Sequence, residues 1–192
     1  MKTALSQLPA GWREIWRADL QKNKKQALAV NGLALGLAAA MLAPFLYGVF
    51  QASSSGGVHF HVTQFLAMLA GLLAYISLHE LVHGLCMKYF GAKKVHYGYA
   101  GVYAWAGSKA YFGRKSYIVI ALAPLVFWGL VLAALCIVAP AQWFWVFYLV
   151  QVTNVSGAAG DFYIAWKAAR MPAGVLVQDT GLEMTFYAPP PA

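Results

Sequence analysis

Acidic residues are scarce in this chain of 192 residues, which has six Asp and Glu against fourteen Lys and Arg. Charged residues of both signs make up only 10% of the chain, whereas apolar and aromatic types make up 61%. That apolar share is far above the usual range for a soluble domain. The composition therefore indicates a polytopic membrane protein.

Cysteine is also scarce, since the chain has only Cys86 and Cys136. Two cysteines are too few for a disulfide framework. The topology derived below places them near opposite faces of a membrane, so we expect both to be unpaired, small apolar side chains. Cys86 nevertheless follows His79 by seven residues on the same helix face, which leaves open a thiol near that histidine.

Long stretches carry almost no charge, and about twenty apolar residues suffice for a helix to cross the hydrocarbon core. Four such stretches are predicted to be transmembrane helices: residues 26–50, 64–90, 117–139 and 142–166. Gly91 is predicted to end the second helix. Pro124 is predicted to kink or locally open the third.

The N-terminal segment, residues 1–25, is rich in lysine and arginine. Between these basic residues, Trp12, Ile15, Trp16 and Leu20 recur at helical spacing. This pattern predicts an amphipathic helix lying on an anionic lipid leaflet. A nucleic-acid-binding arm is the competing interpretation, but the tryptophans and the membrane segment that follows account for the charges. We therefore expect no nucleic-acid partner.

Two other segments are typical of short strands. Residues 95–106 alternate aromatic residues with glycines, which predicts strands or a hairpin. Residues 175–187 alternate around Asp179-Thr-Gly181, which predicts a hairpin. Either segment could present an edge to an extended substrate, but for the second a small cap on the cytoplasmic side is the favoured interpretation.

The expected fold is thus an all-α polytopic membrane protein. It has about four transmembrane helices, an N-terminal interfacial helix and small cytoplasmic β-like segments. The expected domains are a segment 1–25, a membrane domain 26–171 and a cytoplasmic tail 172–192.

The basic residues fall in three regions, which are the N-terminal segment 1–25, the loop 88–115 and residues 167–170. The loops 51–63 and 140–141 contain no Lys or Arg. Because cytoplasmic loops of membrane proteins carry the excess of basic residues, both termini and the middle loop are predicted to be cytoplasmic.

One motif stands out inside the second apolar segment, namely His79-Glu80-Leu81-Val82-His83. In a helix, HExxH places two imidazoles one turn apart on the same face, where both can bind one metal ion, with the glutamate as general base. Such a motif can arise by chance in a soluble helix. A carboxylate at the membrane centre, however, costs about 2.5–3.5 kcal/mol, so intramembrane acids are usually functional.

A catalytic zinc site needs three protein ligands and an open position. His79 and His83 lie roughly 22 and 28 Å below the outer end of their helix, at 1.5 Å per residue. Asp161 lies roughly 28 Å down the fourth segment by the same rise and is the only other acid within an apolar segment. Asp161 is therefore the predicted third ligand and His96 the alternative, since the histidines of loop 51–63 lie on the opposite side.

Small residues precede Asp161 in the stretch Asn154-Val-Ser-Gly-Ala-Ala-Gly-Asp161. Such residues allow helices to approach closely, and Gly157 and Gly160 are also candidates to break the helix. Asn154 lies two turns before Asp161. Its amide is a candidate donor to a substrate carbonyl or oxyanion, with a plain helix-to-helix hydrogen bond as the equal alternative.

Together, HELVHG at 79–84 and Asn154-x-Ser-x-x-x-x-Asp161 resemble the intramembrane zinc metalloproteases of the site-2 protease type. The arrangement is closer still to a bacterial family of small membrane zincin peptidases, in which Pro124 and Gly160-Asp161 also have counterparts. The chain departs from site-2 proteases in lacking an Asn-Pro-x-Pro element before the aspartate. The resemblance implies that His79, His83 and Asp161 are zinc ligands and that Glu80 is the general base.

The expected function is that of an intramembrane zinc metalloprotease of the bacterial inner membrane. It would hydrolyse membrane-associated substrates near the cytoplasmic face, with Asn154 as a candidate oxyanion donor. Two alternatives stay open. One is a zinc-binding pseudo-protease that acts as a membrane scaffold or chaperone. The other is a small transporter, which four segments without an inverted repeat disfavour. The sequence does not indicate an oligomeric state.

Overall fold

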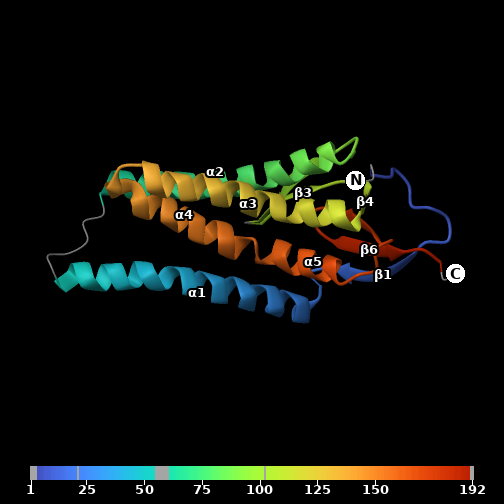
Figure 1. Cartoon of the computed structure of the whole chain (residues 1–192), viewed down its shortest axis with the longest axis horizontal. Coiled ribbons are helices and arrows are strands. Elements are labelled where there is room, and N and C mark those ends of the chain that lie inside the picture. The colour runs from blue at the N-terminus through green and yellow to red at the C-terminus, as the bar shows by residue number, and fades with distance from the viewer. Residues whose placement is uncertain (1–3, 21, 55–60, 102, 191–192) are drawn as a thin grey trace. The chain divides into compact units, whose positions relative to one another are not determined.

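Helices dominate the computed structural model, which describes residues 4–20, 22–54, 61–101 and 103–190 (Figure 1). The helices are α1 (Lys24–Ser54), α2 (Val62–Tyr89), α3 (Arg114–Val138), the short 3₁₀ turn η1 (Ala141–Trp143), α4 (Phe144–Gly157) and α5 (Ala159–Ala169). The strands are β1 (Arg13–Ala18), β2 (His96–Ala100), β3 (Tyr103–Gly107), β4 (Tyr111–Gly113), β5 (Leu176–Asp179) and β6 (Met184–Ala188).

Three of the described helices are long and apolar enough to cross a membrane, within Lys24–Gln51, Val62–Tyr89 and Arg114–Val138. The fourth expected segment is helical but divided at Ala158 into α4, with 14 residues, and α5, with 11. Neither piece alone reaches the ~20 residues that span a bilayer. The helices of the four segments are thus confirmed, together with a break beside Gly157, while four crossings stay a prediction.

The N-terminal segment does not form the expected interfacial helix. Pro9 and Gly11, whose φ is +79°, precede a strand over Arg13–Ala18. In this strand Trp16 faces inward onto Phe186, with ring centroids 5.2 Å apart, while Arg17 is exposed and pairs with Glu14 and Glu183. The helical spacing of the tryptophans was misleading, because pairing with β6, at the other end of the chain, decides the local structure.

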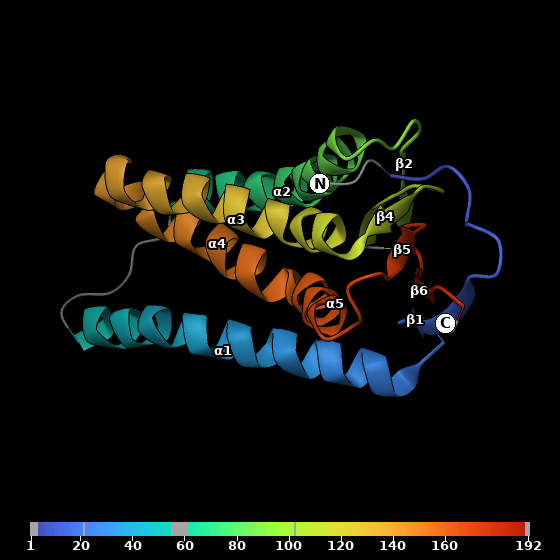
Figure 2. The same ribbon diagram turned by 45° about the vertical axis from the view of Figure 1, so that its right-hand side comes forward.

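The structure therefore has more β-structure than the expected all-α fold. Four strands form one antiparallel sheet in the order β1-β6-β5-β4, which Figure 2 shows side by side. The sheet joins the N-terminal segment, the loop before α3 and the C-terminal tail. The predicted hairpin around Asp179-Thr-Gly181 is confirmed as β5–β6, with Gly181 at a φ of +87° in the turn.

A hydrophobic core fills the space between this sheet and parts of α2, α3 and α5. Each fully buried large side chain contributes about 1.5–3 kcal/mol relative to exposure. The cluster consists of Ala18, Met87, Phe90, Ala92, Phe112, Tyr117, Ile120, Ile164, Ala168, Val175, Val177 and Phe186.

A second, two-stranded sheet is the hairpin predicted within residues 95–106, formed by β2 and β3. It packs closely on α2, because a side chain at Gly84 would overlap the Tyr97 hydroxyl. The end of α2 is also as predicted. Gly91 has a φ of +100°, and the Ala92 N–H donates to the Met87 carbonyl at 2.9 Å, as in a Schellman helix stop.

The chain divides into two compact units. Unit 1 consists of Met1–Val30, Ile76–Pro124 and Gly160–Ala192 and contains both sheets and the HExxH residues. Unit 2 consists of Asn31–Tyr75 and Leu125–Ala159. Its helices are tied by polar contacts such as Tyr148 Oη to the Met41 carbonyl at 2.6 Å. The loop histidine His59 lies outside the described residues.

Candidate metal centre

Helix α2 presents His79 and His83 one turn apart, as the spacing predicts. Both are buried, each with 8% of its surface exposed, and their ring centroids are 4.9 Å apart. One ligand atom from each of His79, Glu80 and His83 can be chosen so that all three lie within 4.8 Å of one another. Two imidazoles and a carboxylate are thus close enough to hold one metal ion.

A second carboxylate, from Asp161, contacts both imidazoles. Its Oδ2 lies 3.2 Å from His79 Nε2 and its Oδ1 lies 3.4 Å from His83 Nε2. Asp161 is in the first turn of α5 because the chain breaks at Ala158 and a new helix begins at Ala159. A helix N-terminus favours a carboxylate, so the break both positions and stabilises this charge.

Pro124 has a part in orienting His83. A proline has no N–H, so within α3 the carbonyl of Ile120, four residues earlier, lacks its helical partner. His83 Nδ1 lies 2.9 Å from that carbonyl oxygen and is buried. Because a carbonyl only accepts, Nδ1 carries the proton, and His83 Nε2, which faces Asp161, is the ring nitrogen available to a metal ion. Such a contact is how metal-binding histidines are commonly held.

This donor set suits zinc. Two neutral imidazole nitrogens and a carboxylate are the ligands of many catalytic zinc sites, and a water or substrate completes the coordination. Here both Nε2 atoms converge on the same partly buried carboxylate, which is the arrangement that a shared cation needs. Glu80 remains as an additional carboxylate within the same group.

A cavity of about 140 Å³ opens beside these groups, lined by residues of α2, α3, α5, β3 and the β5–β6 hairpin. Asp179 of the C-terminal tail lines it, together with Glu80 and Asp161. The Tyr117 hydroxyl and the Gly181 N–H donate to Asp179 at 2.7 and 2.8 Å. Burial nonetheless raises the pKa of the Asp179 carboxyl above its usual value.

Sequence reasoning missed Asp179 as a residue of the site. The tail hairpin was recognised, but a cap was the favoured interpretation, and its acid was not assigned to the cavity. The available indication was that Asp179 is one of only six acids in the chain and lies in the predicted turn.

A larger cavity of about 390 Å³, mostly apolar, adjoins the first. It lies between α2 and the β2–β3 hairpin and shares Glu80, Ala104 and Trp105 with the smaller cavity. The backbone N–H of Ala106 hydrogen-bonds the Glu80 carboxylate. The hairpin therefore forms one wall of both cavities and holds the glutamate between them.

The other candidates lie elsewhere. Asn154, in unit 2, is fully buried. Its Oδ1 accepts a hydrogen bond from the Tyr75 hydroxyl at 2.9 Å. Its Nδ2 donates to the Leu125 carbonyl and to Gln151 Oε1, each at 3.2 Å. The contacts with Tyr75 and Leu125 join different helices, whereas Gln151 lies in α4 with Asn154, and a catalytic role for Asn154 stays a prediction. His96 is exposed and lines a separate cavity. Cys86 packs against the core of unit 1.

Comparison with protein families gives one match. Residues 72–176, just over half of the chain, match the family model described as "Putative zincin peptidase". The matched span contains the HExxH motif, the β2–β3 hairpin, Pro124 and Asp161. Searches of the curated proteins and of the solved structures each return no match.

Proposed function

Since the chain belongs to this zincin peptidase family, we propose that it is a zinc metalloendopeptidase whose ligands are His79, His83 and Asp161. The observation that carries the proposal is that both Nε2 atoms meet one partly buried carboxylate, at 3.2 and 3.4 Å. When bound, zinc would polarise the scissile carbonyl and lower the pKa of a water molecule to about 7.

Glu80 is the proposed general base. Its carboxylate lies in the cavity lined also by His83 and Asp161 and is steadied by the Ala106 N–H. It takes a proton from the attacking water and delivers it to the leaving amine as the C–N bond breaks. His83 keeps its orientation through the Ile120 carbonyl.

The substrate is proposed to bind as an extended segment along β3. The N–H groups of Ala106 and Ser108 point away from β2, toward Glu80 and the Asp179 carbonyl respectively. The N–H of Ala104 points to the same side of β3 as that of Ala106, because successive N–H groups along a strand point to alternate sides. A peptide added at this edge would pass Glu80, and its side chains would enter the 390 Å³ apolar cavity.

The site is proposed to lie near the cytoplasmic face of a bacterial inner membrane, with membrane-associated proteins or peptides as substrates. Connectivity supports four crossings. β1, β4, β5 and β6 share one sheet, so they lie on one side of a membrane. If α1, α2 and α3 each cross, the chain must cross once more between Val138 and β5. Over that described stretch, α4 with α5 is the only α-helical segment.

The first test is the zinc content of the detergent-purified protein, wild type beside His83→Ala and Asp161→Ala. We expect about one zinc per chain in the wild type and loss of zinc in both variants, because catalytic sites use three protein ligands. A wild type that stays free of zinc after metal is added back would sink the proposal.

Turnover is tested with Glu80→Gln, which keeps the size of the side chain and removes the base. We expect this variant to bind zinc normally. New peptide N-termini, detected by mass spectrometry in membranes of cells that express the wild type, should be absent with Glu80→Gln. Identical N-termini with both proteins would favour the zinc-binding scaffold over the protease.

A further inference from the structure

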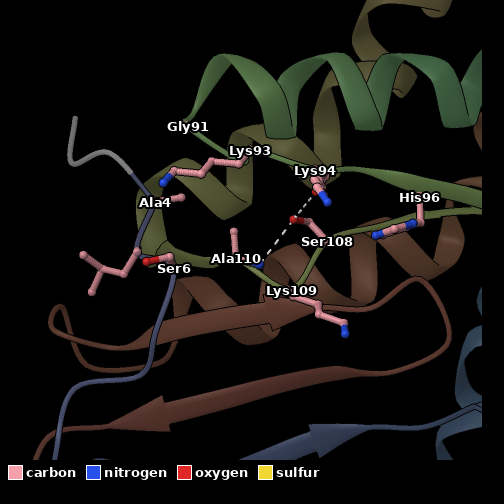
Figure 3. Close-up of a pocket in the computed structure, with 10 residues that line it drawn as sticks. Ala4, Ser6, Gly91, Lys93, Lys94, His96, Ser108, Lys109 and Ala110 are labelled. Atoms are coloured by element: carbon pink, nitrogen blue, oxygen red, sulfur yellow. Dashed lines mark hydrogen bonds between the residues drawn. The ribbon is translucent and has the colours of Figure 1, made fainter.

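A cavity of unit 1 with a volume of about 590 Å³ is separate from the candidate metal centre. Its walls come from three segments, namely residues 4–6, residues 91–96 that follow α2, and the turn 108–110 between β3 and β4. Figure 3 shows Lys93, Lys94 and His96 on one side and Ser108 and Lys109 on the other. It shares no lining residue with the cavity beside the HExxH residues.

The charge of this cavity is of one sign. Lys93, Lys94 and Lys109 line it together with His96, and no Asp or Glu does. Within the described part of the chain, none of the three lysines forms an ion pair. A helix C-terminus attracts lysines through its dipole, but that effect fades within the last turn. It does not account for Lys109, which belongs to a different segment.

Backbone hydrogen bonds hold the walls in place. Leu5 and Tyr111 exchange two hydrogen bonds of 2.9 Å, and the Ala4 N–H donates to the Phe90 carbonyl at 2.8 Å. Ser108, only 3% exposed, donates to the Lys94 carbonyl and accepts from the Ala110 N–H. The two lysine-bearing segments are thus joined through one buried hydroxyl, so the backbone walls of the cavity are held in place.

We propose that this cavity binds a phosphate group, either on the headgroup of an anionic phospholipid or on a soluble phosphate ester. Lysine binds phosphate as a point charge, and three unpaired lysines around one cavity suit a group with one or two negative charges. The volume lies in the range of small-molecule sites. The segment Gly91–Lys94 directly follows α2, a candidate membrane span, where basic residues meet lipid headgroups.

The test compares wild type with Lys93→Gln/Lys94→Gln/Lys109→Gln. In one arm, glycerol 3-phosphate is titrated by calorimetry into protein held in phosphatidylcholine nanodiscs. In the other, nanodiscs contain one part phosphatidylglycerol to four parts phosphatidylcholine, and native mass spectrometry counts the anionic lipids that stay bound. We expect at least about tenfold weaker binding in the triple variant, since it removes three positive charges that attract an anionic group.

A matched control is Lys24→Gln/Lys25→Gln/Lys115→Gln, which removes the same charge from exposed lysines outside the cavity. It should change glycerol 3-phosphate binding less than twofold, and in the second arm it should lose fewer bound anionic lipids than the cavity variant, although Lys24 and Lys25 begin a candidate membrane span. If glycerol 3-phosphate binding is lost only in the cavity variant, the ligand is a soluble phosphate ester. If retention of phosphatidylglycerol is lost mainly in the cavity variant, the ligand is a lipid headgroup. Binding that is equal in all three proteins, or absent in both arms, overturns the proposal; thermal unfolding of each variant confirms that it is folded.

Discussion

At the scale of single residues, Pro124 illustrates how a helix defect serves the metal centre. It frees the Ile120 carbonyl, which His83 Nδ1 then contacts at 2.9 Å. In Pro124→Ala the new N–H competes for this carbonyl. We expect zinc affinity to fall about tenfold, because partners that orient a metal-binding histidine typically contribute 10–100-fold. Competition with a chromophoric chelator measures it.

The control is Pro44→Ala, since Pro44 also lies inside a helix but in α1. Equal zinc affinity in wild type and Pro124→Ala would show that the Ile120 carbonyl does not orient His83.

Asp179 gives a prediction about pH. Burial raises its pKa in the folded protein above the usual value of 3.8, whereas the unfolded chain keeps that value. Between the two values the folded state therefore binds more protons than the unfolded state. The free energy of unfolding should fall as pH rises from about 3.8 and level off above the folded pKa.

Asp179→Asn removes this contribution, because the amide does not titrate. We expect the melting temperature of the metal-free variant to depend less on pH over that window than the wild type's, measured in the presence of a chelator. Parallel curves for the two proteins would contradict the assignment of the raised pKa to Asp179.

At the scale of elements, the contact between α2 and the β2–β3 hairpin shapes the apolar cavity. A methyl group at Gly84 would overlap the Tyr97 hydroxyl, the far end of a side chain that is 46% exposed and free to swing outward. Gly84→Ala should therefore leave stability nearly unchanged, since alanine also favours the helix by up to about 1 kcal/mol. Because displacing Tyr97 changes the shape of the apolar cavity, Gly84→Ala should raise KM for an extended peptide several-fold, with kcat little changed.

Gly32→Ala is the matched control, because no atom lies within 4 Å of a side chain added there. A loss of kcat with constant KM in Gly84→Ala would mean that Tyr97 acts on the chemistry and not on the cavity.

The elements that the sequence predicts well are those with local causes. The helices follow from apolar length, the end of α2 from Gly91, and the approach of His79 to His83 from their spacing in one turn. The strand β1 was mistaken for a helix because its partner, β6, lies at the other end of the chain. Asp179 was missed for the same reason, since only the pairing of the tail with β4 brings it to the cavity.

At the scale of the whole molecule, the sheet constrains the membrane topology. Because β1, β4, β5 and β6 pair with one another, the segments around residues 115 and 182 must lie on the same side of the membrane. The turn before α4 should lie on the other side, where no basic residue occurs between α3 and α4. This topology predicts which positions a membrane-impermeant reagent can reach.

The measurement uses single cysteines placed at the exposed positions Lys115, Ala141 and Leu182, in a chain with Cys86→Ser and Cys136→Ser. Spheroplasts treated with a membrane-impermeant maleimide should be labelled at position 141 alone, and inverted vesicles at 115 and 182. Because the sheet joins the segments that carry positions 115 and 182, opposite labelling of these two positions is incompatible with this fold in a membrane. Labelling of all three from one side would instead mean that α3 and the α4–α5 pair do not cross.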